Sequence, residues 1–153
     1  MAQLDHKIPP PVVAVVALPV MWLLSSVLPR VEYSPTVRVA LAGGVLVIGL
    51  AFSIAGALAF RRAKTTVNPL RPEQASTLVT TGVYRITRNP MYVGLMLALL
   101  AWAVWLASPL SLAGPVLFIA YIDRFQIRPE EAVLTAKFGA VYEQYESAAR
   151  RWL

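Results

Sequence analysis

The stretch LVTTGVYRITRNPMYVG, residues 78–94, stands where a basic polar segment meets a long apolar one. It contains a tight-turn signal at Thr81-Gly82, two arginines, two tyrosines and an Asn-Pro pair that is typical of a helix start. The preceding residues 61–77 are polar and basic, and no charged residue follows until Asp123. This arrangement predicts a polar site at the face of a membrane.

The composition is that of an integral membrane protein, with one domain in 153 residues. Apolar residues make up 58% of the chain, charged residues 14%, and the mean hydropathy is +0.61. The chain has no cysteine and a single histidine, His6, which excludes a disulfide framework and a Cys/His metal site. The net charge of +6 lies at the ends of apolar runs, a topology pattern that argues against nucleic-acid binding.

An all-α membrane fold with four spanning helices is predicted. The charge-free run 89–122 is 34 residues long, and as one straight helix it would extend about 51 Å, well beyond a bilayer. Ser108-Pro109 divides this run into a tight hairpin. The predicted spans are 11–28, 39–60, 90–107 and 109–126.

The second span carries small residues at four-residue spacing, Gly49, Ser53 and Ala57. Such a seam favours close packing against another helix. Small residues are also frequent in membrane helices generally, so both interpretations stay open.

The distribution of positive charge predicts the orientation. With four spans, both termini and the loop 61–89 lie on one side, which holds twelve of the 14 basic residues and leaves Arg30 and Arg38 opposite. The positive-inside rule therefore predicts that this side is cytoplasmic, most simply in a bacterial-type plasma membrane.

Residues 129–153 are predicted to form an amphipathic helical segment on the cytoplasmic face. Gly139 is expected to divide it, and its Tyr and Trp residues are expected at headgroup depth. The apolar positions recur at three- and four-residue spacing: Leu134, Phe138, Val141, Tyr142, Tyr145, Ala149 and Trp152.

Polar features on the same side are candidates for a binding site. Asn89-Pro90 can cap a helix whose positive end attracts a carboxylate or phosphate, or it can simply start that helix. Arginines at such an edge, here Arg85 and Arg88, commonly set topology or contact lipid headgroups.

A second set of polar residues follows the last span. In a continuous helix Arg124, Arg128 and Glu131 share one face, although Pro129 is expected to kink or restart that helix. Glu130-Glu131 either complements the helix dipole or binds a cationic group such as an amino-acid ammonium. The residue types alone leave both readings open.

Four segments together carry a family resemblance: TTVNPLRP (65–72), LVTTGVYRITRNPMYVG (78–94), PEEAVL (129–134) and FGAVYEQY (138–145). In their order and separation the chain resembles the isoprenylcysteine carboxyl methyltransferase family, which is related to the phospholipid N-methyltransferases and is built of membrane helices. The resemblance covers about 80 residues of the C-terminal half.

The resemblance implies a methyltransferase that holds S-adenosylmethionine without a Rossmann fold. By position, the implied cofactor-binding residues are Gly82, Tyr84, Arg88, Asn89, Pro90, Tyr92, Gly94, Glu130, Glu131, Tyr142 and Tyr145.

Two departures from the family pattern bear on the chemistry. Asn89 replaces the motif histidine and cannot titrate near neutral pH. Gln144 and Ala148 stand where the prenylcysteine enzymes carry Glu and Arg. The candidate catalytic residues are therefore other arginines of this side, namely Arg128, Arg150 and Arg151.

The favoured function is S-adenosylmethionine-dependent methyl transfer, most simply to a carboxyl oxygen of a lipophilic or prenylcysteine-like acceptor that enters from the bilayer. The alternatives are a non-catalytic membrane scaffold that binds lipid or a partner, and a phospholipid N-methyltransferase or lipid reductase on a related frame. Membrane lipids are the expected surroundings, and neither a metal nor nucleic acid is expected.

Overall fold

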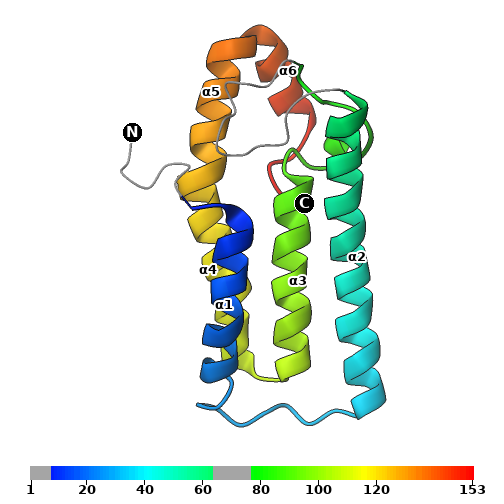
Figure 1. Cartoon of the computed structure of the whole chain (residues 1–153), viewed down its shortest axis with the longest axis vertical. Coiled ribbons are helices and arrows are strands. Elements are labelled where there is room, and N and C mark those ends of the chain that lie inside the picture. Colours follow the sequence, from blue (N-terminus) through cyan, green and yellow to red (C-terminus); the bar gives the residue numbers. More distant parts are fainter. Residues whose placement is uncertain (1–7, 64–76) are drawn as a thin grey trace.

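The computed structural model describes residues 8–63 and 77–153, and over these ranges the chain is helical without a strand (Figure 1). His6 and the segment 65–72 lie outside the described residues. Four helices run side by side, and α3 is central because it packs against the other three. They are α1 (Pro10–Leu24), α2 (Pro35–Arg62), α3 (Pro90–Leu106) and α4 (Ala113–Ile122).

Shorter elements lie between and beyond these helices. A 3-10 turn precedes α3, another precedes α4, and a π turn joins α4 to two further helices at the polar end of the bundle. They are η2 (Gly82–Arg85), η3 (Pro109–Leu112), η4 (Asp123–Ile127), α5 (Arg128–Phe138) and α6 (Ala140–Ala148).

The predicted hairpin is confirmed, and α3 differs from its predicted bounds by one residue. The first helix is shorter than the predicted 11–28. It ends at Leu24 because the Ser25 and Ser26 hydroxyls donate to the carbonyls three residues back, at 2.6 and 2.7 Å. The second helix is longer than predicted, since the Ser34 hydroxyl caps its first turn by accepting from the Val37 N–H at 3.2 Å.

The sequence predicts a kink or a restart of the helix at Pro129. Helical structure continues from Pro109 to Phe138, and a separate α-helix, α5, begins at Arg128, which fits a restart. The π turn explains this. The Arg128 N–H donates to the Asp123 carbonyl, five residues back, so Pro129 enters at the first turn of α5, where its missing N–H costs little. The resulting run of 30 residues is about 45 Å long, so α5 stands beyond the apolar part of the bundle.

The small-residue seam of α2 is confirmed for Gly49 and Ser53. A Cβ added at Gly94 of α3 would lie 2.0 Å from the Ser53 Oγ and 2.6 Å from the Gly49 carbonyl oxygen. Gly56, in place of the expected Ala57, continues the contact, because a Cβ there would lie 3.1 Å from the Pro90 Cγ. The two backbones approach this closely only because these residues are small.

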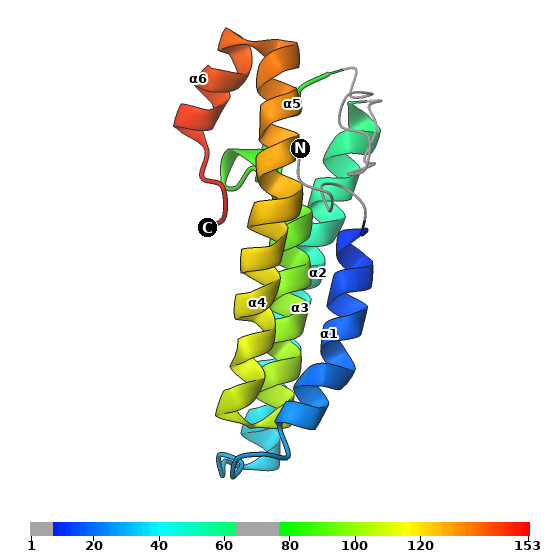
Figure 2. The same cartoon turned by 90° about the vertical axis from the view of Figure 1, so that its left-hand side faces the viewer.

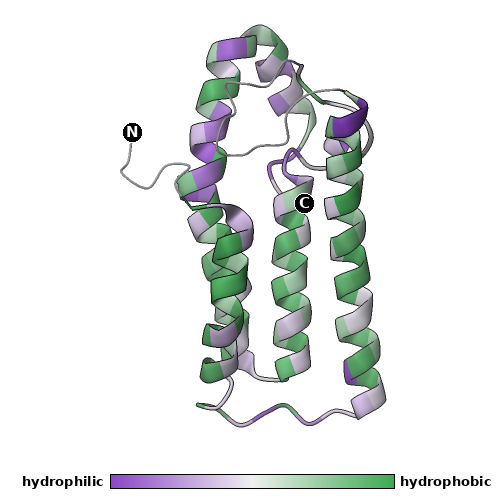
Figure 3. Cartoon of the chain, in the orientation of Figure 1, coloured by the Kyte–Doolittle hydropathy of each residue, from purple (hydrophilic) through white to green (hydrophobic). Residues whose placement is uncertain are grey.

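The helices of the bundle are mostly apolar away from α5 and α6 (Figure 3), and many of their large apolar side chains are exposed. Large apolar side chains such as Val15, Val47 and Leu117 are each about 65% exposed on three different helices. Two helices, Pro35–Arg62 and Pro109–Phe138, are long and apolar enough to cross a membrane, and α1 and α3 are shorter apolar helices. These are the features of a membrane protein.

The segment 129–153 does not lie flat as one surface helix. The break at Gly139 is confirmed, with φ at +52°, and α6 folds back beside α5 (Figure 2). The expected headgroup depth of the Tyr and Trp residues stays a prediction, but Tyr142 and Tyr145 face the protein interior. They are 2% and 9% exposed and form an apolar cluster with Tyr84, because the turn brings α6 over η2.

Candidate functional site

The start of α3 meets the start of α5 at the polar end of the bundle. The Tyr92 hydroxyl donates to the Glu130 Oε1 at 2.6 Å. Tyr92 is 7% exposed and Glu130 is partly buried, so this bond is shielded from solvent. It links two elements 38 residues apart in the sequence.

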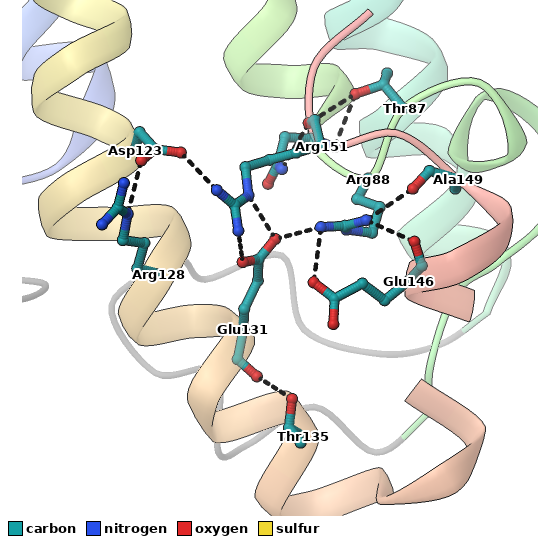
Figure 4. Close-up of polar contacts among 10 residues, drawn as sticks. Thr87, Arg88, Asp123, Arg128, Glu131, Thr135, Glu146, Ala149 and Arg151 are labelled. Atoms are coloured by element: carbon teal, nitrogen blue, oxygen red, sulfur yellow. Dashed lines mark hydrogen bonds and ion pairs between the residues drawn. The ribbon is translucent and has the colours of Figure 1, made fainter. Parts of the chain in front are cut away.

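Arg88 joins the same two elements to α6. Its Nη2 lies 2.7 Å from the Glu131 Oε1 and 3.0 Å from the Glu146 Oε1, and its Nη1 donates to the carbonyls of Glu146 and Ala149 at 2.9 and 2.7 Å (Figure 4). The Arg88 side chain is only 8% exposed. A guanidinium with this many short contacts at low exposure is held in one orientation.

Arg151 holds the other side of Glu131. Its Nε lies 3.0 Å from the Glu131 Oε1 and its Nη2 lies 2.6 Å from the Oε2, which is a two-point ion pair (Figure 4). Its Nη1 reaches the Asp123 Oδ1 at 3.2 Å, and the other oxygen of Asp123 pairs with the Arg128 Nε at 2.8 Å. The hydrogen bonds to Glu131 raise the pKa of Arg151, and partial burial opposes this only in part.

The segment 149–153 runs beside the start of α3. Thr87 and Arg150 form an isolated parallel bridge, in which the Arg88 N–H donates to the Arg150 carbonyl at 2.8 Å. The Arg151 carbonyl accepts from the Thr87 hydroxyl at 3.2 Å and from the Asn89 Nδ2 at 2.9 Å.

Asn89 occupies the N-cap position of α3, but the expectation that its side chain caps the helix is wrong. The Asn89 amide turns instead toward the carbonyl of Arg151, since the segment 149–153 lies against this turn and offers that acceptor. An asparagine supplies this N–H donor without titrating, so no base is available at this position.

Three tyrosines close the site from the side of α2. The Tyr145 hydroxyl donates to the Tyr84 carbonyl at 2.8 Å, and the Tyr84 ring meets the Phe60 ring edge-on, with centroids 5.3 Å apart. Burial raises the pKa of Tyr84, Tyr142 and Tyr145 above the ordinary value, and the charge of nearby Glu130 adds to this at Tyr84. These hydroxyls therefore remain neutral hydrogen-bonding groups at physiological pH.

The structure brings most of the predicted cofactor-binding residues to this end of the bundle. They are Tyr84, Arg88, Asn89, Tyr92, Glu130, Glu131, Tyr142 and Tyr145, with the turn at Gly82, where φ is +63°, beside them. Pro90 is buried against Gly56, and Gly94 faces α2 within the helix seam.

The three candidate catalytic arginines are in different settings. Arg151 lies inside the ion-pair network, the Arg128 side chain is 61% exposed, and Arg150 is exposed. Sequence reasoning missed Glu146 and Thr87 as members of the site. An acidic residue two positions after Gln144, where the family glutamate is absent, was the only available signal for Glu146.

Comparisons with known proteins agree with this architecture. The family model described as phospholipid methyltransferase matches residues 37–141, which is more than half of the chain. An uncharacterized protein of Haemophilus influenzae is 48% identical over 63 residues, which is 41% of this chain and 100% of that protein.

Curated plant enzymes are also similar. A probable protein-S-isoprenylcysteine O-methyltransferase of Oryza sativa subsp. indica is 34% identical over 84 residues, 55% of this chain and 44% of the enzyme. Protein-S-isoprenylcysteine O-methyltransferase A of Arabidopsis thaliana is 32% identical over 109 residues, 69% of this chain and 54% of the enzyme. The chain thus spans about half the length of these plant relatives.

No solved structure matches the chain. The family match runs from α2 through α5 and ends at the start of α6, so Tyr142, Tyr145, Glu146 and the segment 149–153 lie beyond it. The chain therefore belongs to the phospholipid methyltransferase family and is similar to the isoprenylcysteine O-methyltransferases, which confirms the resemblance in its motifs.

Proposed function

We propose that this protein is an S-adenosylmethionine-dependent methyltransferase that acts on a lipophilic acceptor at the cytoplasmic face of a membrane. The observation that carries the proposal is the contrast between two adjacent glutamates. Glu131 is bound on both oxygens by arginines, whereas Glu130 has only the Tyr92 hydroxyl and no basic partner among residues 8–63 and 77–153.

The local charge balance points to a cationic ligand. As formed by the described residues, the ion-pair network contains three arginines and three carboxylates, whose charges balance without Glu130. Burial raises the pKa of the Glu130 carboxyl to about 8, so near neutral pH it is mostly protonated until a cation pairs with it. A shielded carboxylate without a counter-ion is costly, and a ligand ammonium or sulfonium would relieve that cost.

The residues present fit the proposed cofactor. Glu130 would hold its ammonium, and the neutral hydroxyls of Tyr84 and Tyr142 would line the space beside it. The cofactor, when bound, supplies a methyl group on a positively charged sulfonium sulfur. Tyr92 keeps the Glu130 carboxylate in one orientation, and methyl transfer depends strongly on such orientation.

The side chains also favour a carboxylate acceptor. A carboxylate needs positioning but no base to accept a methyl group, and position 89 holds asparagine where the family motif has histidine. A groove of about 590 Å³ between the end of α2 and residues 77–83 offers apolar walls. Leu58 and Val79 line it together with Arg62, a combination suited to a lipophilic molecule with an anionic end.

Calorimetry of the detergent-purified protein with S-adenosylmethionine and S-adenosylhomocysteine tests the proposal. We expect saturable binding of both, and we expect Glu130→Gln to weaken it about 10- to 100-fold, the range for loss of a charge-assisted hydrogen bond. Glu143→Gln is the matched control, because it removes one negative charge from an exposed position of α6.

Two results would reject the proposal or its ligand assignment. Absence of binding by the unmodified protein rejects the cofactor, and equal weakening in both variants rejects the specific role of Glu130. If binding is found, mass spectrometry of membrane lipid extracts incubated with methyl-labelled cofactor identifies the acceptor. Labelled phospholipid amine in place of a carboxyl ester would establish N-methylation.

A further inference from the structure

We infer that Arg151 is a positioning residue for the cofactor site, acting through Glu131 on the first turn of α5. The inference rests on the proposed function, because the group that it positions is Glu130. It gives the segment 149–153, which lies outside the family match at 37–141, a part in ligand binding.

Arg151 has the geometry of a clamp on Glu131. Its Nε contacts the Glu131 Oε1 at 3.0 Å and its Nη2 contacts the Oε2 at 2.6 Å. Its Nη1 contacts the Asp123 Oδ1 at 3.2 Å. The Glu131 side chain is 13% exposed and that of Arg151 is 36% exposed, so the pair is only partly screened by solvent. A two-point guanidinium–carboxylate pair restricts the direction of the carboxylate as well as its distance.

The backbone of the same segment anchors the clamp to the other half of the site. Its carbonyls at Arg150 and Arg151 accept from the Arg88 N–H, the Thr87 hydroxyl and the Asn89 amide. The Trp152 side chain, one residue further, packs against the core that includes Tyr92. Arg151 therefore bridges the turn before α3 and the helical run that contains Asp123 and Glu131.

The contacts of Arg151 and the Tyr92–Glu130 hydrogen bond both connect the start of α3 to the first turn of α5. Glu130 and Glu131 are consecutive residues in the first turn of α5. Contacts that hold the Glu131 side chain therefore also restrain the backbone that carries Glu130. With Arg151 removed, the Arg88 Nη2 would be the remaining basic contact of Glu131 within residues 8–63 and 77–153, and Arg88 also pairs with Glu146. We expect the turn to shift and the 2.6 Å Tyr92–Glu130 bond to loosen.

The test compares Arg151→Gln with Arg85→Gln, which removes a positive charge from an exposed position of η2 at the same end of the bundle. Calorimetry with S-adenosylhomocysteine gives the affinity. Amide hydrogen exchange without ligand reports on residues 85–93 and 128–133. We expect Arg151→Gln to weaken binding at least fivefold and to speed exchange in both segments, and Arg85→Gln to do neither. Arg151→Lys, which keeps one ionic contact, should recover part of the affinity.

A double variant separates positioning from simple stability. If Arg151 acts through Glu131, then Glu131→Gln with Arg151→Gln binds no more weakly than Glu131→Gln alone. Multiplicative losses would overturn the inference, as would tighter binding by Arg151→Gln, which would make Arg151 a competitor of the ligand. If the unmodified protein binds no cofactor, the proposed function fails, whereas the exchange comparison still decides whether Arg151 orders the site.

Discussion

Two neighbouring carboxylates in one helical turn have different surroundings, and this difference defines the site at the scale of residues. Glu131 forms ion pairs with Arg88 and Arg151, whereas Glu130 accepts one hydrogen bond from Tyr92 among the described residues. Both are acidic residues in the first turn of α5, so the helix dipole does not distinguish them. Contacts from distant parts of the chain do.

The Tyr92 hydroxyl can be tested separately from the Tyr92 ring. Tyr92→Phe leaves the Glu130 Oε1 without its donor, and we expect a loss of about 1–2 kcal/mol in unfolding free energy, together with weaker cofactor binding. Tyr121→Phe is the control, since the buried Tyr121 hydroxyl has no partner within the part of the chain that the structure describes. Thermal unfolding in detergent should show little change for the control, and an equal loss in both would contradict this account.

Close packing of small residues places the site at the scale of elements. The contact of Gly49 and Ser53 with Gly94 brings α2 against α3, and α3 in turn presents Tyr92, in its first turn, to Glu130 of α5. The π turn at Asp123–Ile127 has a comparable effect in the fourth helix. It allows Pro129 to lie in the first turn of α5, and α5 places Glu130 and Glu131 beyond the apolar part of the bundle.

A methyl group added at the seam should separate α2 from α3. In Gly94→Ala the new Cβ would meet the Ser53 Oγ and the Gly49 backbone oxygen, so we expect destabilisation of about 1–3 kcal/mol. Gly44→Ala is the matched control in α2, because a Cβ there meets nothing within 4 Å. It should be neutral or slightly stabilising by helix propensity. Chemical or thermal unfolding measures the stability of both variants. Similar unfolding midpoints for Gly94→Ala and Gly44→Ala would contradict close packing of α2 against α3 at Gly94.

The whole molecule is polarised along its long axis. Hydrophilic residues gather at the end formed by η2, α5 and α6, and the rest of the bundle is mostly apolar along its helices (Figure 3). Many large apolar side chains of these helices are exposed. On the opposite end, the Arg38 guanidinium lies over the Trp105 ring, 5.1 Å from its centroid. An arginine stacked on tryptophan in this place is typical of a membrane–water interface.

The orientation in the membrane can be measured directly because the chain has no cysteine. Ser147→Cys places a thiol on exposed α6, and Glu32→Cys places one in the exposed connection between α1 and α2. In intact bacterial cells we expect a membrane-impermeant maleimide to label position 32 and to label position 147 only after permeabilisation. The reverse pattern would place the site outside the cell.

Much of the architecture followed from the sequence through hydropathy and local breakers. The length of the charge-free run and Ser108-Pro109 predicted the hairpin, and the bounds of α3 were within one residue. Helix ends governed by side chains were less predictable. Ser25 and Ser26 close α1 early, and a π turn precedes the restart of the helix at Arg128. Both effects depend on hydrogen bonds whose alternatives have similar energy.

By itself, the sequence determined a helical membrane bundle with its charges at one end, since burying a charge in hydrocarbon is costly wherever it occurs. It also identified the motif residues that gather there. Only the tertiary structure decided that Glu131 is occupied by Arg88 and Arg151, and that Glu130 is not. These contacts join positions 20 to 43 residues apart, and their geometry depends on how α3, α5 and the segment 149–153 pack.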